Sequence, residues 1–535
     1  MNVPRLCHRF AAALMLLATS LFMSQTASAE AVRFSAGEGA PVQIEAPDIM
    51  PSWFDADGPN ADAWAALLAL GDAASHGLVP RDYDAEGLMQ AFETASQQHP
   101  AARERLETAL TDAVVRFVAD LNAGRLDPEV LRHRFKAPAT PAFDARSHVL
   151  EMRLAGRLAD ALRGPRDPIP MYDALRSVMN QYRSLGDHPA WAARLPDLPR
   201  SLRPGDHWDG LPLLAARLHA LGDLDEAGLA SVTTQYEPPL VEAVQRFQER
   251  HGLDVDGVIG KGTLAEVNTS PAQRARQMAL TLERLRWTPL LRAPRMIVVN
   301  IPEFILRAYE VRDRTVELDL EMRVVVGRAL NTRTPIFLED MRYIEFSPYW
   351  NVPSSIARSE TLPRLRRDPG YFSREGFEFV TREGNVVTAL SEEAIDAVQR
   401  GQWRIRQQPG PRNALGDIKF IFPNDQNIYL HHTPSTQLFS RARRDFSHGC
   451  IRVELPVELA AFVLKNQPEW TTERIEQAMT AERSRTVALR EPIPVLLTYS
   501  TVVIKNGGKV YFFPDIYQQD ARLEQALLKA RPVRP

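Results

Sequence analysis

Two short segments near the C-terminal end concentrate residue types that can do covalent chemistry. Residues 428–434 read IYLHHTP, and residues 447–453 read SHGCIRV. The chain has two cysteines, and Cys450 is the one that lies away from the N-terminus. A thiol with three histidines close by in the sequence predicts nucleophilic catalysis by cysteine.

The chemistry expected of this cluster is acyl transfer. A thiol attacks as its thiolate, whose free pKa of ~8.5 usually has to be lowered, and an imidazole can take that proton and later protonate a leaving amine. Gly449 would let a substrate carbonyl approach, and the N–H groups around Gly449 and Cys450 could stabilise an oxyanion. Four nearby arginines are expected to favour the thiolate and a carboxylate-bearing substrate: Arg441, Arg443, Arg444 and Arg452.

Two alternatives use the same residues. Zinc also takes Cys and His ligands, but the spacing of His448 and Cys450 is not a usual structural pair and no second nearby Cys exists, so we expect no metal site. The other alternative is core packing of buried histidines. Because neighbouring residues on a strand point to opposite faces, at most one of His431 and His432 is expected to face the thiol.

The elements that must position this cluster are predicted to be strands. Residues 296–300 are apolar, residues 304–309 suit a hairpin partner, and residues 316–324 alternate with period two. Strand character resumes at 418–422 and 428–430. A late hairpin is predicted from the runs 495–499, 502–504 and 510–513 with Gly507-Gly508 between them.

Residues 355–410 interrupt these strands with charged, partly helical sequence. We interpret them as an insertion in the β-rich domain, of the kind that acts as a lid beside a site.

The first half of the chain has a helical period. Trp64, Leu67 and Leu68 repeat at helix spacing, and similar runs continue to about residue 221. A smaller unit follows at 202–268, in which AVQRFQ precedes GLDVDGVIG. That pattern resembles the three-helix peptidoglycan-binding domain of cell-wall enzymes, although a packing module without a ligand remains an alternative.

The N-terminus and the composition bound the class of protein. Residues 1–29 have a positive start, an apolar run and small residues at 27–29, which predicts a cleaved export signal, with an uncleaved anchor as the alternative. Lys and Arg number 64 against 67 Asp and Glu, a net charge of −3, so a nucleic-acid-binding protein is not expected. With 44% hydrophobic residues the chain is globular.

The segments around Cys450 resemble the motif of the L,D-transpeptidases, the YkuD-type catalytic domain. In that family a His-x-Thr-Pro or His-Gly-Thr segment precedes [Ser/Thr]-His-Gly-Cys-x-Arg. The chain resembles the large multidomain YcbB-like branch in particular. Further matching segments are 324–327, 334–335, 348–353 and 515–517.

The resemblance implies a multidomain α+β chain with a mainly β catalytic domain. The expected divisions are a signal peptide at 1–29, a helical scaffold at 30–201, a peptidoglycan-binding domain at 202–268, a helical connector at 271–294, a catalytic domain at 295–490 with a cap at about 355–410, and a C-terminal hairpin and helix at 491–535 packing on the scaffold or catalytic domain.

The resemblance also assigns roles by position. Cys450 would be the nucleophile and His431 the general base and acid, with His448 and then His432 as competing candidates. Gly449 would support the oxyanion site. Substrate-binding roles are expected for the following residues: Arg452, Ser447, Trp350 and Tyr429.

The implied reaction forms 3→3 peptidoglycan cross-links through a cysteine thioester, releasing D-Ala from a tetrapeptide stem. No cofactor is needed, and the expected partners are stem peptides and glycan, with other cell-wall synthesis enzymes as further candidates. After signal cleavage the protein would lie in the periplasm without spanning the membrane. Alternatives are an L,D-carboxypeptidase, an enzyme that attaches protein to the wall, and a non-catalytic wall-binding scaffold.

Overall fold

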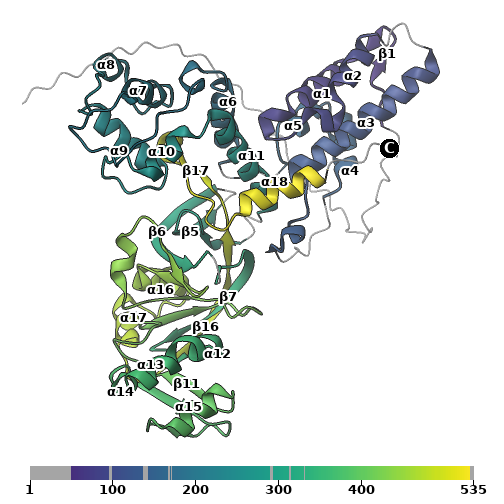
Figure 1. Ribbon diagram of the computed structural model, residues 1–535. Helices are drawn as coiled ribbons and strands as arrows, with labels where there is room; N and C mark the ends of the chain where they lie inside the picture. The colour runs from purple at the N-terminus through teal and green to yellow at the C-terminus, as the bar shows by residue number, and fades with distance from the viewer. Residues whose placement is uncertain are drawn as a thin grey trace, which may run out of the picture. The chain divides into compact units, whose positions relative to one another are not determined.

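The computed structural model in Figure 1 describes residues 50–94, 99–135, 143–166, 169, 171–288, 293–312, 315–329 and 332–530. The predicted signal peptide at 1–29 lies outside these residues. Within the described part of the chain, no helix combines the length and the apolar character that a membrane crossing requires.

The N-terminal part of the described chain is helical, as its period predicts. Its elements are β1 (Phe54–Asp55), β2 (Gly58–Pro59), α1 (Ala61–Gly71), η1 (Ala73–His76), η2 (Pro80–Tyr83), α2 (Ala85–Glu93), α3 (Pro100–Ala123), η4 (Pro128–Leu131), β3 (Arg134–Phe135), α4 (Ala145–Leu154), α5 (Leu158–Arg163), α6 (Tyr172–Ser184) and η5 (Pro189–Trp191). Asn60 caps α1 by accepting the Ala63 N–H at 3.0 Å. The apolar stripe of α3, which includes Val114 and Phe117, is fully buried.

The next unit has its own core and contains α7 (Leu211–Ala220), α8 (Glu226–Ala230), α9 (Leu240–Arg250) and α10 (Lys261–Asn268). It has the three predicted helices and one short additional helix, α8. The glycine-rich turn after α9 is closed by Gly257, which adopts a φ of 69° and accepts the Tyr236 hydroxyl at 2.7 Å. Leu214, Val244 and Phe247 are among the buried residues of this core.

The predicted connector is a core helix, α11 (Pro271–Trp287), which starts at a capping box formed by Ser270 and Gln273. It packs on α6 through Met278 and Leu282, both fully buried. Its buried Arg286 binds Glu283 at 2.9 Å and donates to the Tyr172 hydroxyl at 2.9 Å. The helix is therefore held on several sides rather than being an exposed linker.

The catalytic region is a β-sheet with two covering helices. Its elements are β4 (Arg295–Asn300), β5 (Ile305–Arg312), β6 (Thr315–Gly327), β7 (Phe337–Phe346), β12 (Ile418–Ile421), β13 (Leu430–His431), η7 (Thr436–Ser440), β14 (Asp445–Ser447), β15 (Ile451–Val453), α16 (Pro456–Leu464), α17 (Thr472–Met479) and β16 (Arg485–Thr498).

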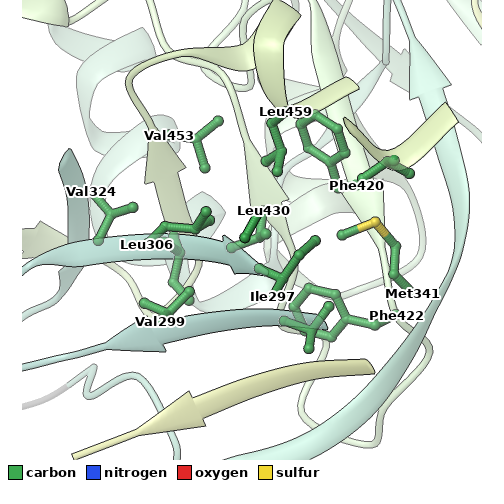
Figure 2. Packing of buried hydrophobic residues seen from close by; sticks show 14 of the residues in the cluster. Ile297, Val299, Leu306, Val324, Met341, Phe420, Phe422, Leu430, Val453 and Leu459 are labelled. Carbon is green, nitrogen blue, oxygen red and sulfur yellow. The ribbon is translucent and has the colours of Figure 1, made fainter. Parts of the chain in front are cut away.

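The strand order is β12-β13-β15-β6-β5-β4-β16-β7-β3, with β14 beside β6. Because β12 also pairs with β7, the path closes on itself, and β3 from the helical region adds to the edge at β7. The predicted pairing of 296–300 with 304–309 is confirmed by the β4–β5 ladder. Figure 2 shows the interior, where Ile297, Leu430 and Leu459 meet, each fully buried. Such a side chain contributes about 1.5–3 kcal/mol by leaving water.

The insertion forms a subdomain with a separate core. It contains β8 (Trp350–Asn351), α12 (Ser354–Ile356), the π-helical turn η6 (Ala357–Thr361), α13 (Leu362–Arg367), α14 (Gly370–Arg374), β9 (Phe377–Val380), β10 (Val386–Val387), α15 (Glu392–Gln399) and β11 (Arg404–Gln407). Phe346 of β7 lies opposite Ile418 of β12, so the insertion is placed between two paired strands. The order of its own sheet is β10-β9-β11-β8. The inserted cap of the predicted fold class is confirmed.

The C-terminal segment contains β17 (Val502–Lys505), η8 (Asn506–Gly508), β18 (Lys509–Phe512) and α18 (Gln519–Lys529). The hairpin turn at Gly507-Gly508 is confirmed, but the run 495–499 was wrongly placed in that hairpin. Val495 pairs with Ile297, so the run belongs to β16 in the main sheet, and the expected boundary at 490 falls inside this strand. An apolar run in a buried strand has no period that distinguishes a hairpin from a central position.

The hairpin packs on the peptidoglycan-binding unit as well as on α6 and α11. His251 stacks on Phe512 with ring centroids 5.2 Å apart, and Arg250 donates to the Val510 carbonyl at 3.3 Å. The expectation named the scaffold or the catalytic domain as the partner of this segment. The hairpin also contacts α9 of the unit at 202–268 and the connector helix α11, and sequence periodicity could not predict these contacts.

Candidate active site

Parallel pairing of β13 and β15 brings the two chemistry-bearing segments together. Leu430 lies opposite Ile451 and His431 opposite Arg452, and the Ile451 N–H donates to the Tyr429 carbonyl at 3.1 Å. Leu430 and Ile451 are fully buried in the core. Because side chains alternate along a strand, the residues directly before and after Leu430 and Ile451 lie on the opposite face of the sheet. This face presents Tyr429, His431, Cys450 and Arg452.

The turn before the thiol depends on a glycine. Gly449 has a φ of 117°, and a Cβ there would lie 3.3 Å from Ile428 Cδ1. The Ser447 hydroxyl accepts the Gly449 N–H at 3.2 Å and donates to the Cys450 carbonyl at 2.6 Å. The Thr334 hydroxyl donates to the Gly449 carbonyl at 2.8 Å. These bonds hold the backbone that presents Cys450.

Two expectations about this turn change. The Gly449 N–H is used inside the turn, so the expected oxyanion donors reduce to the N–H of Cys450. Ser447, assigned to substrate binding, is 2% exposed and its hydroxyl is engaged by the turn. The structure therefore places Ser447 as a brace of the loop and not on the surface that a substrate reaches.

Burial raises the pKa of the Cys450 thiol. Hydrogen bonding from Tyr429 and the positive charges of Lys419 and Arg452 oppose that shift. The sulfur also lies 3.6 Å from the Asn427 carbonyl. The Cys450 thiol is thus neutral at neutral pH, and not the thiolate that the arginine-rich sequence predicts.

Three of the four arginines that lie near Cys450 in the sequence contact other groups, so they do not favour the thiolate as expected. Arg443 binds Asp445 at 2.6 Å, and Arg444 donates to the Phe304 carbonyl at 3.2 Å. Arg441 lies over the Phe446 ring at 5.4 Å. Of the four predicted cations, Arg452 is the one whose charge acts on the thiol.

His431 is buried as a neutral imidazole on the face that carries Cys450. Burial, with the charges of Arg452 and Lys419, lowers the pKa of His431 to about 3, while the carbonyls of His432 and Leu415 favour the charged form. Its Nδ1 lies 2.5 Å from the His432 carbonyl. That partner fixes the proton on Nδ1 and leaves Nε2 as the basic nitrogen.

His432 points away from His431, as strand alternation requires. Its Nδ1 lies 3.2 Å from Asp417 Oδ2, next to Gly416, where a Cβ would come within 2.5 Å of the same nitrogen. The structure therefore separates the two adjacent histidines, with His431 on the face of the thiol and His432 paired with Asp417.

His448 reaches the cap. Its Nε2 lies 2.7 Å from Glu360 Oε1 of η6. Nothing in the local sequence predicts this contact, because the two residues are far apart in the chain.

The remaining predicted residues divide between the site and the cap. The Tyr429 ring lies edge-on to His431, with centroids 5.8 Å apart, and 4.2 Å from Lys419 Nζ. Arg452 presents a buried Nε that has no hydrogen-bond partner among the described residues. Trp350 packs against the core of the cap and is not brought to the thiol.

Sequence reasoning missed several residues that shape the site: Lys419, Asp417, Glu360 and Thr334. Thr334 belongs to a Thr-Pro segment that carries the family resemblance, and that segment was its available signal. Lys419 is a strand residue opposite His431, a register that a sequence period does not reveal. Among the described residues, no group of three or more His, Cys, Asp and Glu side chains is placed to hold a metal ion.

Comparison with known proteins gives three domain matches. Residues 294–478 match the L,D-transpeptidase catalytic domain (YkuD), residues 45–179 match a scaffold domain, and residues 210–266 match a model described as "Putative peptidoglycan binding domain". A protein of Haemophilus influenzae named "Putative L,D-transpeptidase" is 35% identical over 252 residues, which cover 47% of this chain and 49% of that protein. The match spans about half the length of this curated relative.

A solved structure of a fused Zn-dependent amidase/peptidase/peptidoglycan-binding domain-containing protein from Clostridium acetobutylicum also aligns. Its identity is 10%, its TM-score 0.17, and the alignment covers 56% of this chain and 100% of that one. At this TM-score the similarity carries no argument.

Residues 294–478, which hold Cys450 and the strands around it, are thus similar to the YkuD L,D-transpeptidase catalytic domain. The chain combines this domain with a second region, residues 210–266, that matches the peptidoglycan-binding domain.

Proposed function

We propose that the protein is an L,D-transpeptidase that forms 3→3 cross-links between peptidoglycan stems through a thioester on Cys450, and that it works in the periplasm. The observation that carries the proposal is the shared face of β13 and β15, on which a cysteine, a neutral histidine, a tyrosine and an arginine lie together at the end of a glycine turn.

In the first half-reaction the Cys450 sulfur attacks the amide carbonyl between the third stem residue and D-Ala. His431 takes the thiol proton as the C–S bond forms and gives it to the departing amine as the C–N bond breaks. The Cys450 N–H is the proposed donor to the oxyanion. A neutral imidazole is the form of His431 that can accept this proton.

In the second half-reaction the side-chain amine of another stem attacks the thioester. The new amide bond forms, the C–S bond breaks, and Cys450 is regenerated. The cap is proposed to limit the access of water to the thioester. If water attacked instead, the product would be a tripeptide, and the activity would be that of an L,D-carboxypeptidase.

Binding of the donor stem is proposed to use Arg452 and Tyr429. The buried and unpartnered Nε of Arg452 suits a carboxylate, because a buried guanidinium donor is costly to leave unpaired. Tyr429 contributes an aromatic wall next to the thiol. The unit at 202–268 is proposed to hold the enzyme on the glycan–peptide polymer.

The direct test is incubation of the protein with purified disaccharide-tetrapeptide, followed by mass spectrometry, with Cys450→Ala in parallel. We expect a dimer that lacks one D-Ala, formed by the wild type and absent from the variant. Tripeptide monomer alone would identify a carboxypeptidase. No product from either protein would favour attachment of a protein amine to the wall or a non-catalytic scaffold.

A further inference from the structure

A second cation lies beside His431, on the side away from Cys450. The strand order β12-β13-β15 places His431 between Lys419 and Arg452, and each of these residues lies directly opposite His431 in its ladder. Figure 2 shows Phe420, the neighbour of Lys419, in the interior of the domain. Because side chains alternate along a strand, Lys419 lies on the opposite face, together with His431. One row across three strands therefore carries a cation, an imidazole and a second cation.

The Lys419 side chain extends from this row toward the level of the thiol. Its Nζ lies 4.2 Å from the centroid of the Tyr429 ring. In the parallel ladder of β13 and β15, Tyr429 is level with Cys450. The charge of Lys419 favours the thiolate of Cys450, and it also lowers the pKa of His431. The ammonium is thus placed near both of the groups that are proposed to react.

The Lys419 ammonium is held in place and can still bind a ligand. Its Nζ lies 3.7 Å from Oε2 of Glu345, the residue opposite Lys419 on β7, and this distance is longer than a hydrogen bond. Glu345 is itself held by the hydroxyl of Ser484, which donates to Oε1 at 3.2 Å. An ammonium has three N–H groups, and the Lys419 side chain is 20% exposed, so it can donate to a ligand on this face.

The proposed donor stem carries a carboxylate that has to come to this row. The leaving residue is D-Ala, and its terminal carboxylate carbon lies two bonds, about 2.5 Å, from the amide nitrogen that His431 is proposed to protonate. With the reacting carbonyl at Cys450 beside β15 and the amide nitrogen at His431 of β13, the next group along the stem lies over β12. The cation that β12 presents there is Lys419. Arg452 lies on the other side of His431, toward the residue that stays on the enzyme.

We propose that Lys419 binds the terminal carboxylate of the leaving D-Ala and thereby selects donor stems that end at this residue. The ligand class is an amide-linked D-amino acid with a free α-carboxylate. A charge-assisted contact of this kind is stronger than one between neutral groups, and partial burial limits its screening by salt. Lys419 is the specificity-determining residue, and Glu345 is a positioning residue that acts through it. This inference rests on the proposed function and deepens it, since it names the group that recognises the leaving residue.

The test compares two donors that differ in this carboxylate alone. One is disaccharide-tetrapeptide, and the other is the same compound with the terminal carboxylate of D-Ala converted to a carboxamide. The full-length protein carries Lys419→Met or Lys419→Arg. Lys465→Met is the matched control, because Lys465 is an exposed lysine that is also paired with a glutamate, Glu310. Release of D-Ala or of its amide is followed by mass spectrometry and expressed as kcat/KM.

We expect the wild type to prefer the carboxylate donor by about tenfold or more, as the loss of a contact with a charged group predicts. Lys419→Met should lose this preference, because kcat/KM falls for the carboxylate donor and changes less than about threefold for the carboxamide donor. Lys419→Arg should keep the preference, since it keeps the cation. Lys465→Met should keep both rates.

An equal loss with both donors in Lys419→Met would overturn the proposal, because it would indicate that Lys419 only supports the Tyr429 ring. A Lys419→Met variant that retains the preference would overturn it as well. If the wild type released no leaving group from either donor, the proposed function would fail and this inference with it. Release by the wild type without any preference between the donors would remove the inference alone.

Discussion

At the scale of residues, the site combines a neutral thiol with a neutral imidazole. Burial raises the pKa of Cys450 and lowers that of His431, so both groups are neutral at neutral pH. A thiolate–imidazolium pair is therefore not the resting state. In the proposed reaction, charge develops only while the carbonyl is attacked, at the point where the Cys450 N–H is the proposed donor.

The raised thiol pKa predicts slow alkylation at neutral pH. We expect the rate of iodoacetamide labelling of Cys450 to keep rising beyond pH 9, because the thiolate fraction increases up to the pKa of the group. Tyr429→Phe should slow labelling at pH 8, since the Tyr429 hydroxyl favours the thiolate. Labelling is followed by mass spectrometry, with Cys450→Ala to subtract any other site. A rate that levels off below pH 7 would instead indicate a preformed thiolate.

The two adjacent histidines should differ sharply in their contribution to activity. His431→Ala removes the proposed neutral base, and we expect the rate of D-Ala release to fall by about 10²–10⁴-fold. His432→Ala removes a partly exposed contact with Asp417, so its effect should stay below tenfold. Asp417→Asn is the control for that contact. Thermal unfolding of each variant separates loss of chemistry from loss of fold, and the reverse ranking of the histidines would reassign the base.

At the scale of elements, the turn at Gly449 is tied by hydrogen bonds to the end of β6, which lies far away in the sequence. Thr334 accepts the Gly327 N–H at 2.9 Å and donates to the Gly449 carbonyl at 2.8 Å, so one buried hydroxyl ties the end of β6 to the turn. The positive φ of Gly449 makes the turn costly to form without such support.

Thr334→Val should therefore weaken both the turn and the activity. The variant keeps the shape of the side chain but leaves two buried backbone groups without their partner, which costs about 1–3 kcal/mol in the free energy of unfolding. We expect D-Ala release to fall more than the fraction of folded protein at the assay temperature. Thr315→Val on the exposed start of β6 is the matched control for denaturant unfolding and activity. Equal free energies of unfolding and equal activities for Thr334→Val and Thr315→Val would show that the two hydrogen bonds of Thr334 are unimportant.

The sequence predicts the local elements better than their pairing. The alternation in 316–324 marks β6, and the Gly-rich segment 506–508 marks the last hairpin. By contrast, the contact between β13 and β15 joins segments with a long loop between them, and its parallel register decides that Tyr429 lies beside Cys450. Register depends on the packing of the whole sheet, which a local period does not contain.

The same limit applies to the individual side chains of the site. The motif predicts which residue types are present, but not that Arg443 binds Asp445 or that His448 binds Glu360 of the cap. Trp350 is expected to bind substrate, yet it is partly buried and packs against the core of the cap. These outcomes depend on tertiary neighbours that lie far away in the chain.

At the scale of the whole molecule, buried histidines lie where separate regions meet. His76 lies beside the connector residue Arg286, and its pKa is lowered to about 3 by burial and by the charges of Arg176 and Arg286. Burial and Arg284 lower the pKa of His133 to about 4. His251, stacked between Phe247 and Phe512, also has a pKa well below its usual value because it is buried.

These groups predict that mild acid destabilises the protein. The unfolded chain binds a proton at each histidine below pH 6.5, whereas the folded protein does not until the pH falls to about 3 or 4. The stability that these neutral histidines contribute is therefore fully present above pH 6.5. It decreases as the pH falls through that value, and at pH 5 the free energy of unfolding is lower by about 2 kcal/mol for each histidine. Asp120, whose pKa burial raises to about 6, opposes the trend because it binds its proton more readily in the folded state. Asp223, whose pKa burial also raises, acts in the same direction as Asp120, and we expect the histidines together to outweigh these two carboxyls.

We expect Tm to fall clearly between pH 7.5 and pH 5, and His76→Gln to reduce that fall by removing one of the contributing groups. Glutamine retains a polar contact for the Tyr172 hydroxyl, which lies 3.2 Å from His76 Nδ1. His207→Gln is the control, since His207 is exposed and lies in none of these contacts. Calorimetric scans of the three proteins at both pH values give the measurement. A decrease in Tm that is the same in all three would exclude His76 as a source of the acid sensitivity. A Tm that rises toward pH 5 would mean that the buried carboxyls Asp120 and Asp223 outweigh the histidines at the junctions between regions.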